Sequence, residues 1–136
     1  IDRVVRRSET LMLQGKTPVC YTNRTLLTVE NDTPERALSR SVKISQGVQA
    51  LVGRLTVTPA FVIAKGGITS SDVGTKALAV KRARVMGQLR PGVPVWQTGA
   101  ESRFPGIPYV IFPGNVGEES TLREAAEVLL DKTDCG

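Results

Sequence analysis

The sequence contains no histidine, and this absence excludes several kinds of active site. Without histidine the chain cannot itself form Ser-His or Cys-His nucleophile pairs, and it cannot bind zinc through an imidazole. Cysteine is almost as scarce, with Cys20 in an apolar stretch and Cys135 near the C-terminal end. Two cysteines so far apart do not form a disulfide framework, so we expect two reduced intracellular thiols.

Aromatic residues and long apolar runs are also few. The chain has one Trp, two Tyr and three Phe in 136 residues, and they are scattered. No apolar run approaches the roughly 20 residues that a membrane-spanning helix needs, so we expect no membrane association. The chain opens at Ile1 without a methionine and without the regions of a signal peptide. We therefore expect a cytoplasmic protein and a domain cut from a longer polypeptide.

The charge balance is positive, at +5, and favours acidic partners such as nucleic acid or a polyphosphate ligand. Lys76, Lys81, Arg82 and Arg84 form a basic cluster that could contact a phosphate backbone. However, no aromatic residue interleaves with this cluster to stack on bases. We expect a solvated helix face here and no nucleic-acid partner, and nucleic-acid binding stays an alternative.

Helix signals occur at four places along the chain. Apolar periodicity and terminal residues predict helices over residues 2–14 and 34–55, from about Ser71, and from Thr121. Gly15 is expected to end the first helix, and Thr33 followed by Pro34 to begin the second. Thr121 and Glu124 are expected to form a capping box at the last helix.

Short apolar segments predict strands over residues 17–21, 61–64, 92–97 and 108–112. The segment 61–64, FVIA, has no polar alternation, which is typical of a strand covered on both faces. Strands that alternate with helices indicate an α/β fold with a mostly parallel sheet covered by helices. We expect a single compact domain over residues 1–136.

Two glycine-bearing segments follow predicted strands. One is Gly66 to Ser70 after FVIAK, and the other is Gly114 to Gly117 after PYVIF. Ligands of open α/β sheets bind beyond the C-terminal ends of the strands. Glycines let backbone N–H groups converge on an anion, and a following helix N-terminus favours phosphate. Thr69, Ser70 and Ser71 can add hydroxyl donors, Lys65 adds charge, and Asn115 could contact a ribose or phosphate.

Each segment can also be an ordinary turn. Gly-Gly before serine often converts a strand into a helix, and Pro-Gly-Asn often makes a turn. Neither segment matches a Walker A loop or a dinucleotide-binding fingerprint. Nearby, we expect Asp72 to stabilise the first turn of its helix, and Glu101 and Arg103 to form an ion pair in a loop. The residues alone therefore indicate a plausible phosphate site.

Three longer segments carry a more specific signal: AKGGITSSDVGTKAL, VMGQLRPGVPVW and ESRFPGIPYVIFPGNVG. Together they resemble the C-terminal nucleotide-binding domain of the four-carbon acid sugar kinase family, which includes kinases of 3-oxo-tetronate and threonate-type acids. The resemblance is dense over residues 61–118. It implies an α/β lobe that holds ATP, with Mg²⁺ expected. The nucleotide-binding positions that it implies are Gly66, Gly67, Ile68, Thr69, Ser70, Gly114, Asn115 and Gly117.

The same resemblance implies that this chain is one part of an enzyme. The family's substrate site and catalytic aspartate belong to an N-terminal lobe with an Asp-Asp-x-Thr-Gly motif, which does not occur here. We expect the partners to be adenine nucleotide and that N-terminal lobe, with a homodimer as a further option. The isolated domain is expected to be inactive as a kinase. The alternative is an inactive nucleotide-binding or regulatory module, either alone or in a fusion with an aldolase-like or dehydrogenase-like enzyme.

Overall fold

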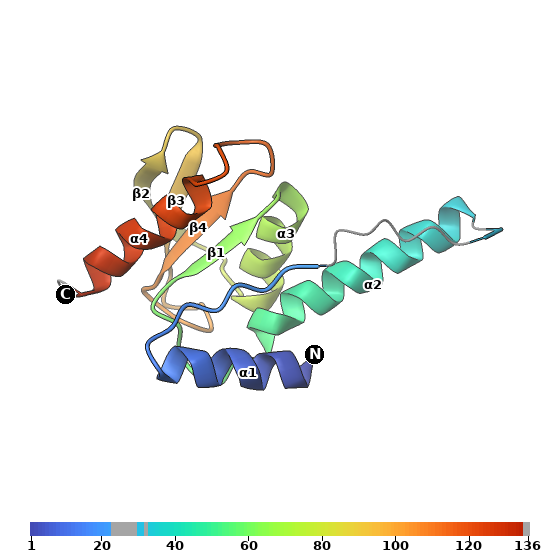
Figure 1. Ribbon diagram of the computed structural model, residues 1–136, viewed down its shortest axis with the longest axis horizontal. Coiled ribbons are helices and arrows are strands. Elements are labelled where there is room, and N and C mark those ends of the chain that lie inside the picture. The colour runs from blue at the N-terminus through green and yellow to red at the C-terminus, as the bar shows by residue number, and fades with distance from the viewer. Residues whose placement is uncertain (23–29, 32, 135–136) are drawn as a thin grey trace. The chain divides into compact units, whose positions relative to one another are not determined.

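The computed structural model describes residues 1–22, 30–31 and 33–134, with side chains described as far as residue 130. It contains two compact units, Ile1–Thr56 and Val57–Gly136, and each is described by itself. In its described residues the first unit contains two helices, and the second unit contains a sheet with helices (Figure 1). Both candidate loops lie in the second unit.

Helix α1 spans Asp2–Leu13 and ends where the sequence predicts. Gly15 has a φ of 78°, in the left-handed region that glycine adopts without steric cost. Its N–H donates to the Met12 carbonyl at 3.0 Å, and the Lys16 N–H donates to the Leu11 carbonyl at 2.9 Å. These two bonds form a Schellman motif, which satisfies carbonyls at the helix end.

Helix α2 spans Pro34–Gly53 and also agrees with the prediction. The Thr33 hydroxyl oxygen accepts the Arg36 N–H at 3.2 Å and caps the helix. The predicted strand 17–21 is wrong: no strand forms over these residues, and Val19 and Tyr21 are 68% and 84% exposed. A strand needs a neighbour to bond its backbone, and both regular elements in the described part of this unit are helices.

Cys20 is exposed and is not in a disulfide, whereas Cys135 lies outside the described residues. The structure therefore agrees with a reduced thiol at Cys20 and does not test the prediction for Cys135.

The sheet of the second unit has four strands in the order β1-β4-β3-β2 (Figure 1). They are β1 (Val62–Lys65), β2 (Ala83–Arg90), β3 (Val93–Thr98) and β4 (Pro108–Phe112). The α/β class is confirmed, but the prediction of a mostly parallel sheet is wrong. In the described chain β1 and β4 are the one parallel pair, and the pairs β3-β4 and β2-β3 are antiparallel. Only two residues join β2 to β3, and so short a connection can make only antiparallel neighbours.

Strand β2 was not predicted from the sequence. Most of its side chains are exposed, so no apolar alternation marks it, and two register shifts interrupt its pairing with β3. The expected helix face for the basic cluster is consequently wrong. Arg84 lies on β2, Lys81 and Arg82 precede it, and only Lys76 lies on a helix.

A short helix follows β1, and it begins four residues before the predicted start at Ser71. Helix α3 spans Gly67–Asp72 and continues into a π-helical turn, η1, over Val73–Ala77. The Tyr109 hydroxyl of β4 donates to the Ser70 carbonyl and accepts the Gly74 N–H. In a regular α-helix that N–H and that carbonyl bond directly to each other. Insertion of the tyrosine hydroxyl between them explains the wider turn.

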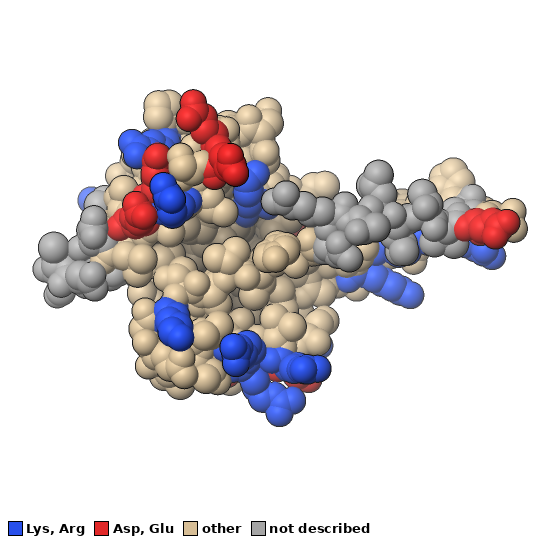
Figure 2. Space-filling view, in the orientation of Figure 1, with Lys and Arg blue, Asp and Glu red and all other residues tan. Residues whose placement is uncertain are grey.

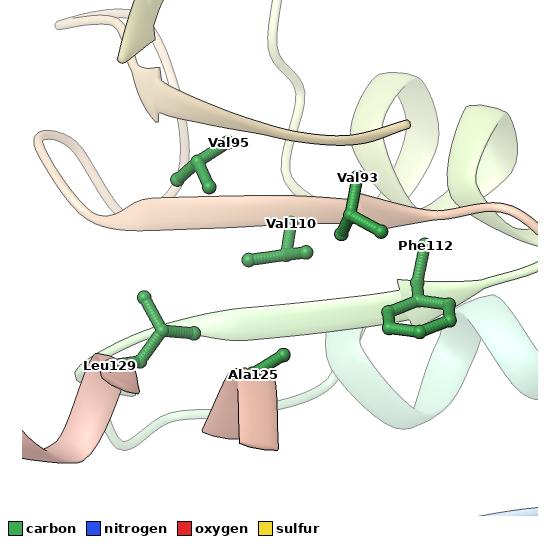
Figure 3. Packing of buried hydrophobic residues seen from close by; sticks show 6 residues of the cluster. All are labelled: Val93, Val95, Val110, Phe112, Ala125 and Leu129. Carbon is green, nitrogen blue, oxygen red and sulfur yellow. The ribbon is translucent and has the colours of Figure 1, made fainter. Parts of the chain in front are cut away.

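Helix α4 spans Thr121–Asp134 and covers the opposite face of the sheet. Successive strand residues point to opposite faces, so Val110 packs toward α4 while Tyr109 contacts α3. The core on the α4 side, seen in Figure 3, consists of Val93, Val95, Val110, Phe112, Ala125 and Leu129. The confirmed strands 92–97 and 108–112 thus supply most of this core.

The predicted capping box at the start of α4 is wrong in detail. Thr121 is the first residue of the helix, and its hydroxyl oxygen accepts the Glu118 N–H at 2.7 Å. The hydroxyl that reaches Glu124 belongs to Ser120, with 3.2 Å between the two side-chain oxygens. The helix therefore begins one residue earlier than a Thr121 cap would require.

Candidate nucleotide-binding site

The two glycine-bearing loops lie side by side at one end of the sheet. They follow β1 and β4, which are parallel, with Lys65 opposite Phe112 in the register. The Gly66 N–H donates to the Phe112 carbonyl at 2.8 Å. A side chain added at Gly114 would begin 3.8 Å from the Gly66 Cα. Figure 1 shows the loop after β4 and the start of α3 at the same end of the sheet. The structure thus brings together the two segments that the sequence singles out.

The backbone of the first loop is open to a ligand. Gly66 has a φ of 101° and occupies the N-cap position of α3. Gly67 is exposed, and a Cβ placed on it would meet no atom within 4 Å. Ile68 is 76% exposed. A phosphate-sized group therefore has free access to the backbone at Gly67, where the first helical N–H groups have no partner within the helix.

The hydroxyl residues of this loop differ in what they can offer. Ser70 is buried, and its hydroxyl donates to the Ala64 carbonyl at 2.9 Å. Its one hydroxyl hydrogen therefore anchors the helix to β1 and is not free for a ligand in this conformation. Thr69 is half-buried, with its hydroxyl oxygen 3.9 Å from the position of a Cβ on Gly66, and Ser71 is exposed. Thr69 and Ser71 are thus better placed than Ser70 to donate to an anion.

The second loop combines exposed and structural positions. Gly114 and Asn115 are exposed, whereas Val116 is half-buried. The methyl carbons of Val116 would lie 3.7 Å from a Cβ on Gly92, in the turn between β2 and β3. Gly117 has a φ of 86°, and a Cβ there would lie 2.7 Å from the Thr121 Cβ. The start of α4 therefore requires a glycine at position 117, and Gly114, Asn115 and Gly117 are all exposed to a ligand.

Lys65 connects the two loops, whereas its sequence position indicated only a positive charge at the strand end. Its Nζ donates to the Gly114 carbonyl at 3.0 Å and lies 5.6 Å from the centre of the Phe112 ring. Its position at the strand end, directly before Gly66, was the signal that could have marked it. Lys65 places a positive charge where the two loops meet.

Glu101 has a structural role at the opposite end of the sheet. Its carboxylate accepts the backbone N–H groups of Lys81 at 2.9 Å and Arg82 at 2.6 Å, just before β2. These bonds lower the pKa of Glu101. The expected ion pair with Arg103 is not what holds this loop, and the Arg103 guanidinium lies over the Phe104 ring at 5.3 Å. Glu101 is therefore separate from the candidate site.

Asp72 ends α3, so its predicted place in the first turn of the helix is also wrong. Its carboxylate pairs with Lys76 at 3.1 Å. Among the described residues, no group of three or more cysteine, aspartate or glutamate side chains could hold a metal ion. Mg²⁺ commonly binds through one or two carboxylates, phosphate oxygens and water. The site thus fits Mg²⁺ only together with a phosphate ligand.

The surface around the loops carries charges of both signs. A shallow, open depression beside them is lined by Glu118, Glu119, Ser120 and Arg123. Figure 2 shows acidic and basic side chains interspersed over this part of the second unit. Interspersed charges do not form the continuous basic stripe typical of a nucleic-acid interface. Within the described residues, no helix has the length and apolar character needed to cross a membrane.

Comparisons with known proteins identify a family and a similar fold. The family described as nucleotide-binding C-terminal domain matches residues 1–122. Among solved structures, the chain is similar to a domain of unknown function (DUF1537) from Bordetella bronchiseptica, a domain-swapped dimer with bound citrate. The TM-score is 0.58 at 18% sequence identity, over 94% of this chain and 37% of that chain. No curated protein matches the sequence. At this identity the structural likeness shows the fold alone.

Proposed function

Because the chain belongs to the family of nucleotide-binding C-terminal domains of four-carbon acid sugar kinases, we propose that it is the ATP-binding lobe of a kinase that phosphorylates a four-carbon sugar acid. The observation that carries the proposal is the meeting of the two loops, with the Gly66 N–H on the Phe112 carbonyl and Lys65 Nζ on the Gly114 carbonyl. Ligands of α/β sheets bind at such strand ends.

In this proposal each accessible group has a part in holding the nucleotide. The backbone at Gly67 receives the phosphates, and the hydroxyls of Thr69 and Ser71 donate to their oxygens. Asn115, on the exposed second loop, contacts the ribose or a phosphate. Mg²⁺ bound with ATP neutralises phosphate charge and is held through the nucleotide and water. Ile68 lies beside the phosphates and supplies its backbone N–H.

The acceptor acid and the catalytic base are assigned to another part of the protein. Phosphoryl transfer needs a group that orients or deprotonates the attacking hydroxyl. The chain has no histidine. The Asp72 carboxylate pairs with Lys76, the Glu101 carboxylate accepts backbone N–H groups, and the Glu124 carboxylate pairs with Arg90. The chain spans 37% of the similar solved structure. We therefore assign the base and the sugar-acid pocket to an N-terminal lobe.

An assay of ADP release tests this division of labour. Four-carbon sugar acids and their oxo forms are offered with ATP and Mg²⁺ to residues 1–136 and to the full-length protein. We expect acceptor-dependent ADP release from the full-length protein alone. Turnover by residues 1–136 would contradict the assignment of the base. Nucleotide binding without turnover on any acid would support the second candidate, a regulatory nucleotide-binding module, for which the exposed loops would serve equally well.

We also propose that the protein is cytoplasmic and that it forms a homodimer. The second proposal is supported by the similar solved structure, which is a domain-swapped dimer. Analytical ultracentrifugation of the chain tests the association. A mass of two chains is expected, and a mass of one chain across the accessible concentrations would contradict the dimer.

A further inference from the structure

We propose that Lys65, held at the junction of the two loops, supplies the positive charge that binds the nucleotide's phosphates. This inference rests on the proposed function and adds to it the residue on which phosphate recognition depends. Lysine binds phosphate as a compact point charge, and its reach is set by a flexible four-carbon stem.

The position of Lys65 is fixed by the sheet. It is the last residue of β1, it lies opposite Phe112 in the parallel register, and it directly precedes Gly66. The Nζ lies 3.0 Å from the Gly114 carbonyl oxygen and 5.6 Å from the centre of the Phe112 ring. The ring face attracts a cation, and the carbonyl accepts its hydrogen bond. The ammonium group is therefore held at the junction of the two loops.

The bonding of this ammonium group is incomplete. An ammonium has three N–H donors, and the Gly114 carbonyl accepts one of them. Among the described residues, no carboxylate forms an ion pair with Lys65. By contrast, Lys76 pairs with Asp72 at 3.1 Å and Arg90 pairs with Glu124 at 3.0 Å. Lys65 thus keeps an uncompensated charge and two donors beside the open backbone at Gly67.

These features match an anionic group better than a nucleoside. A phosphate can accept N–H donors from the ammonium and from the backbone at Gly67 together, because it carries several acceptor oxygens. The contribution of Lys65 should therefore grow with the number of phosphates on the ligand and disappear for adenosine. A residue that only held the loop would change the affinity for all three ligands equally.

Titration calorimetry with ATP, ADP and adenosine tests this inference on the wild-type chain and four variants. Lys65→Met and Lys65→Gln remove the charge, with and without a polar end, and Lys65→Arg keeps it. Lys81→Met is the matched control, because Lys81 precedes β2 and so lies at the opposite end of the sheet. We expect the neutral variants at position 65 to weaken ATP binding about tenfold or more. Adenosine binding should change less than about twofold.

The remaining variants and outcomes distinguish the role of Lys65 in phosphate recognition from the proposed function itself. Lys65→Arg should recover part of the ATP affinity, and Lys81→Met should leave it unchanged. Unaltered ATP binding in Lys65→Gln, or equal losses for ATP and adenosine, would overturn the role of Lys65 in phosphate recognition while leaving the proposed function standing. A wild-type chain that does not bind ATP would overturn the proposed function itself.

Discussion

At the scale of single residues, the glycines of the two loops have different reasons to be glycine. Gly66 and Gly117 have φ values of 101° and 86°, which side chains other than glycine rarely adopt. The fold alone therefore requires them. Gly67 and Gly114 lack a positive φ, and a Cβ on either would meet nothing closer than 3.8 Å. A ligand that approaches the backbone explains these two glycines better than the fold does.

Substitution of the two glycines in the second loop should separate these reasons. Gly117→Ala places a Cβ 2.7 Å from the Thr121 Cβ at a strained φ, so we expect a loss of unfolding free energy of about 1–3 kcal/mol. Gly114→Ala should change stability by less than about 0.5 kcal/mol while weakening ATP binding. Urea unfolding and calorimetric titration of both variants measure this. Equal loss of stability in the two variants would contradict the distinction.

At the scale of elements, the start of α3 shows what the sequence can and cannot predict. The cluster Thr69-Ser70-Ser71 suggested a helix start near Ser71, because such residues often cap helices. In the structure Gly66 is the N-cap, and Ser70 bonds to the Ala64 carbonyl of β1. That bond links the helix to the preceding strand, and a pattern of helix-capping residues does not predict it. The Tyr109 hydroxyl that widens the next turn comes from a strand still further away.

Removal of the Tyr109 hydroxyl should loosen this helix. Tyr109→Phe leaves the Ser70 carbonyl and the Gly74 N–H without their shared partner in a buried position. An unsatisfied buried polar group costs about 1–3 kcal/mol, so the free energy of unfolding should fall by that amount. Tyr21→Phe is the matched control, because Tyr21 is 84% exposed. A Tyr109→Phe protein as stable as the control would show that the hydroxyl does not hold the helix.

The loop before β2 should respond to acid through Glu101. Hydrogen bonds from the Arg82 and Lys81 backbones lower its pKa from the ordinary value of a glutamate, so the carboxylate stabilises the fold above the unfolded pKa. This contribution is lost as the pH falls through the lower, folded pKa. In thermal unfolding across acid pH, Glu101→Gln should melt below wild type at neutral pH, and the difference should shrink in acid. A difference that stays constant with pH would contradict this role.

At the scale of the whole molecule, the sequence predicts which two loops lie together better than it predicts the pairing of the sheet. The buried runs FVIA and PYVIF identify β1 and β4, and their parallel pairing brings the two loops together. The mixed character of the sheet depends on β2, whose exposed side chains carry no apolar pattern, and on its two-residue connection to β3. Residues 17–21 have the composition of a strand, but composition does not provide a pairing partner.

Titration of ATP into the wild-type chain and into Gly67→Val tests the central claim most directly. We expect saturable binding to the wild type, and ATP at 100 times its dissociation constant should stabilise the fold by about 2.7 kcal/mol. Gly67→Val should lose most of this affinity, because its side chain would occupy the open space over the backbone. Its unfolding midpoint without nucleotide should stay close to that of the wild type. No binding of millimolar ATP by the wild type, or equal affinity in the two proteins, would contradict a nucleotide site at these loops.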